Sequence, residues 1–408
     1  MNGTDIDKNA RPDHDTTFDL LANTPEGNHA GMMFFSDHGT PDGFTQEHGY
    51  GCHTFKWVNA EGKFVYIKYT FLAKHGQKQL TRQEANRLGG EDPDYSKREL
   101  YEKIEAKEYP EWTAYVQTMQ PEEADPAKLG FDPFDVTKVW PRKQFPLQEF
   151  GKIVLNKNPE NYHRDVEQAA FSPGAMVPGI EDSPDALLQF RMFFYRDAQY
   201  HRIGVNLHQV PGIYPSSSRL GCLTLTPPVN CPFMASSYSP LNFDGNLRAD
   251  ANHGGNADVN PNSDVMFSKF RPDVAEAPYA VSDNIVSRKS HYYHEGKLSE
   301  YDQARELYTR VMDDNARTAL HANTAHWLAK VSKKVIKVKY LAQQYLIAPA
   351  YARGIYDLLP SPDFAFEEVV ETSNGAESMG KHPKFMPNSG ARSVGYPAPQ
   401  GMGYNGST

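Results

Sequence analysis

The stretch RMFFYRDAQYHRIGVN, Arg191 to Asn206, is the most informative part of this sequence. Arg191 and Tyr195 are four residues apart, so on a helix their side chains lie on one face. A phenol ordinarily has a pKa of about 10, so a phenolate near neutral pH needs positive charge beside it, from a metal ion and an adjacent guanidinium together. The spacing therefore allows Arg191 to act as the charge partner of a phenolate at Tyr195.

The stretch follows the pattern R-x-F-x-Y-x-D-x-Q-x-x-R-x-G-x-N, which resembles the proximal haem helix of the monofunctional haem catalases, where a tyrosine is the axial iron ligand. Further segments match that family in the same order; they are FSDHGTPDGF (35–44), HGYGCHTFKWVN (48–59), EDPDY (91–95), FDPFDVTKVWP (131–141) and GKIVLNKNPENY (151–162). The similarity runs from about Lys8 to about Leu359. We expect the small-subunit type, because no flavodoxin-like C-terminal domain follows.

The resemblance implies an α+β fold, with an antiparallel β-barrel, a wrapping segment and a C-terminal helical domain. We expect a partial barrel in 1–165, the proximal haem helix and wrapping segment in 166–296, the helical domain in 297–360 and a disordered tail in 361–408. The tail prediction depends on the Gly and Pro residues that dominate from Gly380 onward.

Residue patterns give a coarse secondary structure for the first half of the chain. Alternating apolar and polar residues in 53–72, on either side of the turn Asn59 to Gly62, predict a hairpin. Trp112 to Gln120 and Gly151 to Asn156 are further strand candidates. Interleaved charges in 84–107 predict an exposed helix.

The C-terminal part has helical patterns. Ser299 and Asp302 form a candidate capping box, followed by apolar residues at helical spacing. A second helical block is expected from about Thr324 to Leu346, ended by Pro349. The basic cluster at 330–339 is interpreted as a solvated helix face.

The resemblance also assigns a haem site. It makes Tyr195 the axial ligand and Arg191 its charge partner, with His53 hydrogen-bonded toward Arg191 and Asp185 completing the network. The expected contacts of haem b are Arg191, Tyr195, Arg202, Phe171, Gln199 and His53. Among these, Phe171 and Gln199 border the porphyrin and Arg202 pairs with a propionate. Outside the motif, the ordinary interpretations would be a structural tyrosine, a core histidine and a surface arginine.

Two departures from the family pattern stand out. Catalase chemistry needs a distal histidine and asparagine for proton transfer between the peroxide oxygens. No R-x-V-H-A-x-G segment occurs, and His29, His38 and His48 lie in segments that match other positions. We therefore expect the N-terminal arm and the first half of the barrel to be missing, so that the barrel cannot close.

The second departure is an insertion. Gly212 to Pro228 separates Gln209 to Pro211 from Val229 to Pro232, which are continuous in the family. The inserted residues carry one charge and no helical or strand pattern. A retained intron and a true loop explain them equally well.

A nicotinamide dinucleotide site is a further implication of the resemblance. Residues that match positions of an NADPH site are His29, Ser36, Tyr50, Val139 and Trp140, whereas His38, Leu72 and Arg142 depart. His38 stands where an arginine for the 2′-phosphate is usual. The sequence therefore argues against NADPH, which stays an alternative second cofactor.

Composition excludes some classes of protein. The 408 residues carry a net charge of -9, which gives no reason to expect a nucleic-acid partner, and no apolar run approaches the length of a membrane span. Three cysteines without disulfide or metal-ligand spacing suit a reducing compartment. The first residues do not resemble a signal peptide, and the terminal YNGST is not an SKL-type peroxisomal targeting signal. We expect a cytoplasmic protein, or a peroxisomal one that is imported by another route.

The predicted function is that of a haem catalase, the dismutation of hydrogen peroxide to water and oxygen, in a homotetramer as is usual in the family. The alternative is a truncated, catalytically impaired haem-binding chain or a gene-model fragment. A peroxidase or fatty-acid hydroperoxide enzyme on the same scaffold would also need a distal histidine, and we prefer it less.

Overall fold

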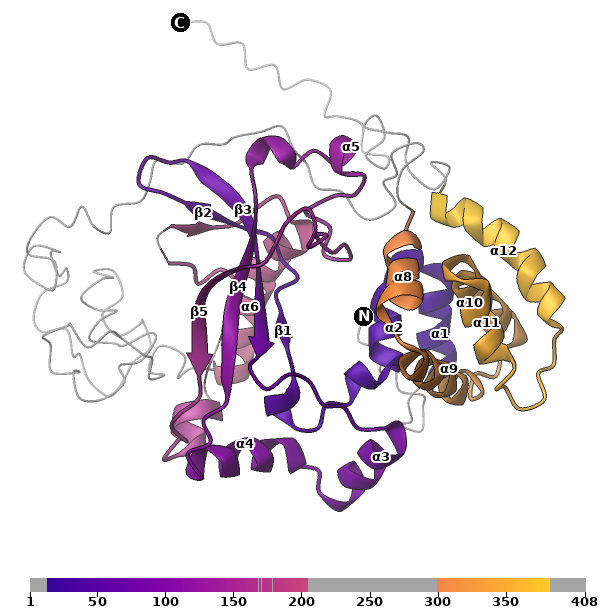
Figure 1. Ribbon diagram of the computed structural model, residues 1–408, viewed down its shortest axis with the longest axis horizontal. Coiled ribbons are helices and arrows are strands. Elements are labelled where there is room, and N and C mark those ends of the chain that lie inside the picture. The colour runs from indigo at the N-terminus through magenta and orange to yellow at the C-terminus, as the bar shows by residue number, and fades with distance from the viewer. Residues whose placement is uncertain (1–12, 168, 170, 178, 205–298, 382–408) are drawn as a thin grey trace, which may run out of the picture. The chain divides into compact units, whose positions relative to one another are not determined.

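The computed structural model of this chain describes residues 13–167, 169, 171–177, 179–204 and 299–381. They fall into two compact units, described separately below: unit 1 is Met1–Cys52, Lys68–Leu155 and Ile285–Thr408, and unit 2 is His53–Ile67 and Asn156–Asn284. Figure 1 labels their helices and strands. The expected insert at 212–228 and most of the expected wrapping segment lie outside the described residues.

Unit 2 contains the predicted hairpin. Strand β2 (Phe55–Val58) pairs antiparallel with the start of β3 (Phe64–Ala73), in the register Phe55 to Ile67. The Asn59 side chain accepts hydrogen bonds from the backbone N–H groups of Glu61 and Lys63, at 3.1 and 2.9 Å, and so closes the turn. The hairpin prediction is confirmed.

Two further elements of unit 2 carry the candidate site. The short strand β6 (Ile180–Glu181) pairs antiparallel with β2. It leads into helix α6 (Ala186–Ile203), which contains the decisive stretch of the sequence as one helix. A single π-helical turn, η5 (His163–Glu167), precedes both.

Unit 1 contains the other part of the sheet, in which strands follow the order β5-β4-β3. Strand β4 (Glu111–Met119) pairs antiparallel with β5 (Gln148–Val154), and β1 (Gly49–Tyr50) pairs with β3. Most side chains of β5 are exposed. Both strand predictions are confirmed, although β5 begins three residues before Gly151.

The expected single helix at 84–107 is wrong in one respect, because two helices form. They are α3 (Arg82–Glu91) and α4 (Tyr95–Glu105). Pro93 lies in the break, where its ring cannot continue the hydrogen-bond pattern of α3. Thr81 and Glu84 form a reciprocal capping box that starts α3. The short helices of this unit are η1 (Pro25–Gly27), η2 (Asp37–Gly39), η3 (Phe44–Gln46), η4 (Pro121–Glu123) and α5 (Pro126–Leu129).

A helical core completes unit 1. Its members are α1 (His14–Asn23), α2 (Asn28–Phe35), α8 (Asp302–Glu306), the π-helical turn η8 (Leu307–Val311), α9 (Asp314–Leu328), α10 (Lys334–Ile347), α11 (Pro349–Tyr356) and α12 (Phe366–Lys381). Helix α10 lies against α1, α11 and α12, and its Tyr340 meets Phe18 edge to face at 4.8 Å. The described residues therefore combine antiparallel strand pairs with helices, as in an α+β fold.

Three expectations about the C-terminal part are corrected. Residues 329–333 interrupt the helical block that we expected from Thr324 to Leu346. Pro349 begins α11 instead of ending the helices. At the first helical position a backbone N–H has no partner within the helix, so the N–H that proline lacks is not missed there. Residues 366–381 form α12 inside the expected disordered tail; Val369 of that helix is fully buried in the core.

Candidate functional site

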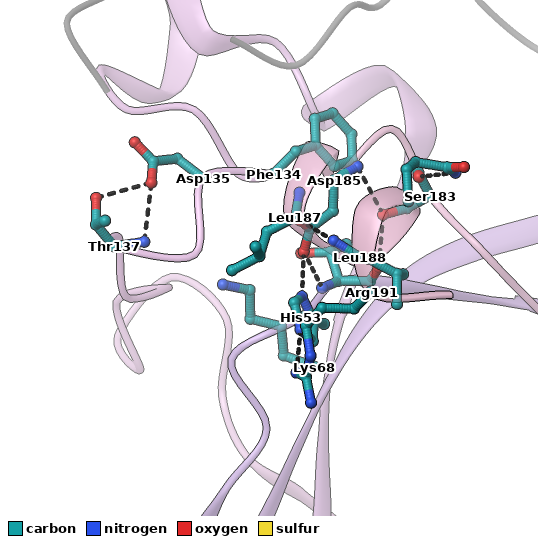
Figure 2. A network of polar contacts seen from close by, with 12 residues as sticks. His53, Lys68, Phe134, Asp135, Thr137, Ser183, Asp185, Leu187, Leu188 and Arg191 are labelled. Carbon is teal, nitrogen blue, oxygen red and sulfur yellow. Dashed lines mark hydrogen bonds and ion pairs between the residues drawn. The ribbon is translucent and has the colours of Figure 1, made fainter. Parts of the chain in front are cut away.

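Asp185 starts α6 and also binds His53. Its Oδ1 accepts hydrogen bonds from the backbone N–H groups of Leu187 and Leu188, both at 3.0 Å. Its Oδ2 lies 2.9 Å from Nδ1 of His53 and accepts from the N–H of Thr54 at 3.3 Å. Asp185 is 1% exposed and His53 6%. One buried carboxylate therefore ties the beginning of α6 to the segment before β2, as Figure 2 shows.

His53 is the middle member of three linked side chains. Its Nε2 lies 2.5 Å from Nη1 of Arg191. A guanidinium has only N–H donors, so Nε2 must accept this bond and carries no proton. The remaining ring N–H is then on Nδ1 and donates to Asp185. The contacts select the neutral Nδ1–H tautomer of His53 and hold the arginine in place.

Arg191 in turn lies against Tyr195, one turn along α6. The guanidinium carbon is 4.6 Å from the centroid of the Tyr195 ring. Tyr195 is half-buried and meets Phe194 edge to face at 5.6 Å. Its hydroxyl makes no hydrogen bond with any residue that the structure describes. A phenol oxygen without a partner, beside a cation, is suited to bind a metal ion.

Ser183 and Thr54 support this arrangement, and the sequence analysis did not single them out. The Ser183 hydroxyl donates to the Thr54 carbonyl oxygen at 2.5 Å and accepts from the N–H of Asp185 at 3.2 Å. Ser183 and Thr54 are both buried. A serine two residues before an N-cap aspartate is the signal that would have suggested this role.

The three remaining residues predicted for the haem site are Phe171, Gln199 and Arg202. Gln199 and Arg202 both bind the backbone of the segment that contains Phe171. Gln199 donates from Nε2 to the Phe171 carbonyl oxygen at 2.5 Å. Arg202 donates to the carbonyl oxygens of Glu167 and Ala169, at 3.1 and 2.5 Å. The last two turns of α6 therefore hold the chain that precedes β6.

Large aromatic side chains are exposed along this part of unit 2. Phe171 is 85% exposed, Phe193 76%, Phe190 58% and Phe194 46%. Exposed apolar patches of this kind mark a surface that a ligand or another chain covers. The unbonded Tyr195 hydroxyl, the neighbouring guanidinium and the exposed Phe171 ring, whose backbone Gln199 holds, could together hold a flat apolar group that carries a metal ion, such as a haem.

Comparison with known proteins decides the family. The family model "Catalase" matches residues 4–265, and the model "Catalase-related immune-responsive" matches residues 294–359. The first of them covers more than half of the sequence. The chain belongs to the catalase family.

Individual catalases agree with this assignment. The chain is 37% identical to the catalase of Ascaris suum over 92% of its own length and 64% of the relative's. It is 40% identical to the catalase of Methanosarcina barkeri over 79% and 59%, respectively. The chain thus spans about 60% of the length of the curated catalases that it matches.

Solved structures confirm the expected catalase-like α+β fold. A fungal catalase aligns with a TM-score of 0.71 at 33% identity, covering 90% of this chain and 68% of that one. Catalase A from Saccharomyces cerevisiae aligns with a TM-score of 0.72 at 34% identity, covering 86% and 68%.

In this member of the catalase family, the residues expected at an NADPH site lie in unit 1. Trp140 is buried and Val139 is exposed. His38, where the arginine is usual, shares a hydrogen bond with the Gln79 side chain at 2.6 Å. Burial, followed by the charge of Lys138, lowers the pKa of His29.

Among the helices that the structure describes, none is long and apolar enough to cross a bilayer.

Proposed function

We propose that this chain binds haem b through Tyr195 and acts in the dismutation of hydrogen peroxide to water and oxygen. The observation that supports the proposal best is the continuous set of contacts from Asp185 through His53 and Arg191 to the Tyr195 ring. It ends at a hydroxyl that has no hydrogen bond among the described residues.

The protein residues have separate roles in this proposal. Tyr195 binds the iron as a phenolate, and bound haem supplies the oxidation and reduction of peroxide. Arg191 stabilises the phenolate by its charge. His53 holds Arg191 through Nε2 and keeps its own proton on Nδ1, where Asp185 accepts it. The guanidinium is thereby kept beside the ring without a second proton on the imidazole.

Three more residues would complete the haem contacts. Phe171 offers an exposed ring to the porphyrin, and Gln199 holds the backbone of Phe171. Arg202 lies seven residues after Tyr195, on the same side of α6, and uses two donors on backbone carbonyls. Its other N–H groups are available for a haem propionate, which a guanidinium binds by charge-assisted hydrogen bonds.

The finer assignments follow from the same proposal. NADPH stays the less favoured second cofactor, because His38 offers no guanidinium to a 2′-phosphate. We propose that this protein forms a homotetramer. We also propose a cytoplasmic or peroxisomal location for it. Similar proteins include the peroxisomal catalases of Pichia angusta and Toxoplasma gondii, at 41% and 36% identity.

A catalytically impaired haem-binding chain is the alternative function. The sequence contains no R-x-V-H-A-x-G segment for a distal histidine. General acid–base assistance contributes about 10²- to 10⁴-fold to a reaction rate. We therefore expect the 408-residue chain to turn over peroxide more slowly than a catalase with a distal histidine, by at least this factor.

Oxygen evolution per bound haem tests the proposal. The chain should be compared with a chimera to which the N-terminal segment of the Ascaris suum relative is fused. The proposal predicts haem binding by both proteins and fast oxygen evolution by the chimera. A chimera that binds haem without evolving oxygen would favour the impaired alternative. Fast oxygen evolution by the chain itself would place the distal acid–base group within this sequence.

A further inference from the structure

The hydroxyl of Tyr308 is paired with the ring of His321 in the helical core of unit 1. Tyr308 lies on the π-helical turn η8 and is 5% exposed, and His321 lies on α9. The phenol oxygen is 3.0 Å from Nε2 of His321. Tyr351 of α11 stacks on both rings, with its centroid 5.1 Å from that of Tyr308 and 5.9 Å from that of His321. Three helical elements therefore hold the pair in place.

The hydrogen bond of this pair runs from the phenol to the imidazole. A hydroxyl that is removed from water needs an acceptor for its proton, and within the described ranges the Tyr308 hydroxyl bonds only to Nε2 of His321. Nε2 therefore accepts, and the ring proton of His321 is on Nδ1. Burial, and then the charge of Arg317, lower the pKa of His321 below its ordinary 6.5. The imidazole is therefore uncharged near neutral pH and has a lone pair that can take up a proton.

Other tyrosine hydroxyls of unit 1 have weaker bases as partners. Tyr356 donates to the backbone carbonyl oxygen of Phe364 at 2.8 Å, and a carbonyl oxygen accepts a hydrogen bond without taking up the proton. Tyr95 donates to Asp42 at 2.7 Å. A hydrogen bond from Lys78 holds the pKa of Asp42 below its ordinary 3.8, so this carboxylate is also a weak base. An imidazole is the stronger proton acceptor.

Arg317 places a positive charge beside the Tyr308 ring. Its guanidinium carbon is 5.8 Å from the ring centroid, and Nη1 donates to the carbonyl oxygens of Tyr308 and Met312, at 3.0 and 2.6 Å. Its ion-pair partner Asp314 has a side chain that is 95% exposed, so water screens that carboxylate. A neighbouring cation opposes a second positive charge on the ring. Loss of an electron from Tyr308 therefore requires that the phenol proton leave as well.

We propose that Tyr308 is a one-electron donor and that His321 takes up its proton during oxidation. The electron passes to a one-electron oxidant of high potential, such as a metal complex in a high oxidation state. The O–H bond of Tyr308 breaks and an N–H bond forms at Nε2 of His321, which leaves a neutral phenoxyl radical beside an imidazolium. Reduction returns the electron to the ring and the proton to the oxygen, as a histidine proton shuttle allows. The step needs neither haem nor peroxide and is independent of the function proposed above.

Photochemical oxidation of the full chain tests this proposal. Light generates a ruthenium(III) bipyridine complex, with a cobalt(III) ammine as the sacrificial electron acceptor, and the sample is frozen for electron paramagnetic resonance. We expect a tyrosyl radical that is coupled to a proton exchangeable in deuterium oxide, because the new N–H of His321 points at the radical oxygen. This measurement needs no variant.

Tyr308→Phe and Tyr356→Phe are the matched variants for the electron donor. Tyr308→Phe should lose most of the radical signal at a low dose of oxidant, whereas Tyr356→Phe should keep it. His321→Gln tests the proton acceptor, because an amide can accept a hydrogen bond but not the proton. It should form less of the radical and shorten its lifetime. His326→Gln is its control, since His326 lies on the same helix and its ring contacts Trp327.

Thermal unfolding establishes that each variant is folded before its oxidation is compared. If Tyr308→Phe does not fold, the exchangeable coupling in the unchanged chain and the two histidine variants decide the question. The proposal is overturned if the unchanged chain forms no tyrosyl radical with an exchangeable coupled proton. It is also overturned if Tyr308→Phe keeps as much signal as Tyr356→Phe, or if His321→Gln behaves like His326→Gln.

Discussion

Nε2 of His53 accepts a hydrogen bond from Nη1 of Arg191, while the opposite ring nitrogen donates to Asp185. A proton on Nε2 would place an N–H against an N–H and break the bond to the arginine. The position of Arg191 beside Tyr195 therefore depends on the Asp185 carboxylate. Asp185 acts through His53, since among the described residues no hydrogen bond joins it to Arg191 directly.

Asp185→Asn should reverse the tautomer of His53 while preserving α6. Asparagine is as good an N-cap as aspartate, so its oxygen can still accept from Leu187 and Leu188. Its NH₂ group then faces Nδ1 of His53, which must become an acceptor, and the proton moves to Nε2. The ¹⁵N chemical shifts of the His53 ring report this directly. An unchanged Nδ1–H signal in the variant would show that the network does not select the tautomer.

Asp185→Ala provides the stability comparison for that variant. It removes the helix cap as well as the bond to His53. We expect a loss of about 2 to 4 kcal/mol in the free energy of unfolding, about 1 from the cap and the rest from hydrogen bonds to a buried charge. Urea unfolding measures it. A loss below that of Asp185→Asn would contradict the dual role of Asp185.

Glu300 should make stability depend on pH. Burial raises the pKa of Glu300 from 4.5 to about 7, although Nζ of Lys138 lies 2.6 Å away and acts in the opposite direction; the charges of Asp135 and Glu26 raise it further. A carboxyl with a raised pKa in the folded state stabilises the fold below pH 4.5, and this contribution is lost as pH rises toward 7. It is at most about 3 kcal/mol.

The variant Glu300→Gln should flatten the stability profile between about pH 4.5 and pH 7. Glu306→Gln is the matched control, because Glu306 is exposed and pairs with Arg310 at 2.6 Å. Urea unfolding at several pH values gives both profiles. A decline of equal slope in both variants would assign the pH dependence to other groups.

Gly354 should not tolerate a side chain. A Cβ at Gly354 would overlap Nδ1 of His321, whose ring is stacked on Tyr351 and hydrogen-bonded to Tyr308 at 3.0 Å. His321 therefore cannot move away easily, and Gly354→Ala should destabilise the fold by about 1 to 3 kcal/mol. Gly89→Ala, on an open face of α3, should instead stabilise it by about 0.5 to 1 kcal/mol. Thermal melting distinguishes them, and equal shifts would contradict the packing argument.

Local chemistry explains which parts of the fold the sequence predicts. The hairpin at 53–72 is predictable because its alternation and its Asn59 turn are both local. The helix breaks are harder. Pro349 has two opposite meanings, since a proline can end one helix or begin the next, and only packing against α10 decides. Helix α12 lies in a stretch whose apolar residues stabilise a helix only by packing against α10, and the sequence does not reveal that contact.

The candidate site shows the same division. The spacing of Arg191 and Tyr195 predicts their contact, because both lie on one helix. The link from His53 to Asp185 joins residues 132 positions apart, and the family resemblance rather than any spacing suggested it. Ser183 and Thr54 were missed because a serine and a threonine in loops have many local partners.

The absorption and electron paramagnetic resonance spectra of the haem-loaded ferric protein test the central claim most directly. Tyr195→Phe should be compared with Tyr200→Phe, which changes another tyrosine of α6. The account predicts a tyrosinate-ligated ferric haem in the unchanged chain and in Tyr200→Phe, and loss of haem retention in Tyr195→Phe. Retention of haem by Tyr195→Phe with an unchanged spectrum would contradict it.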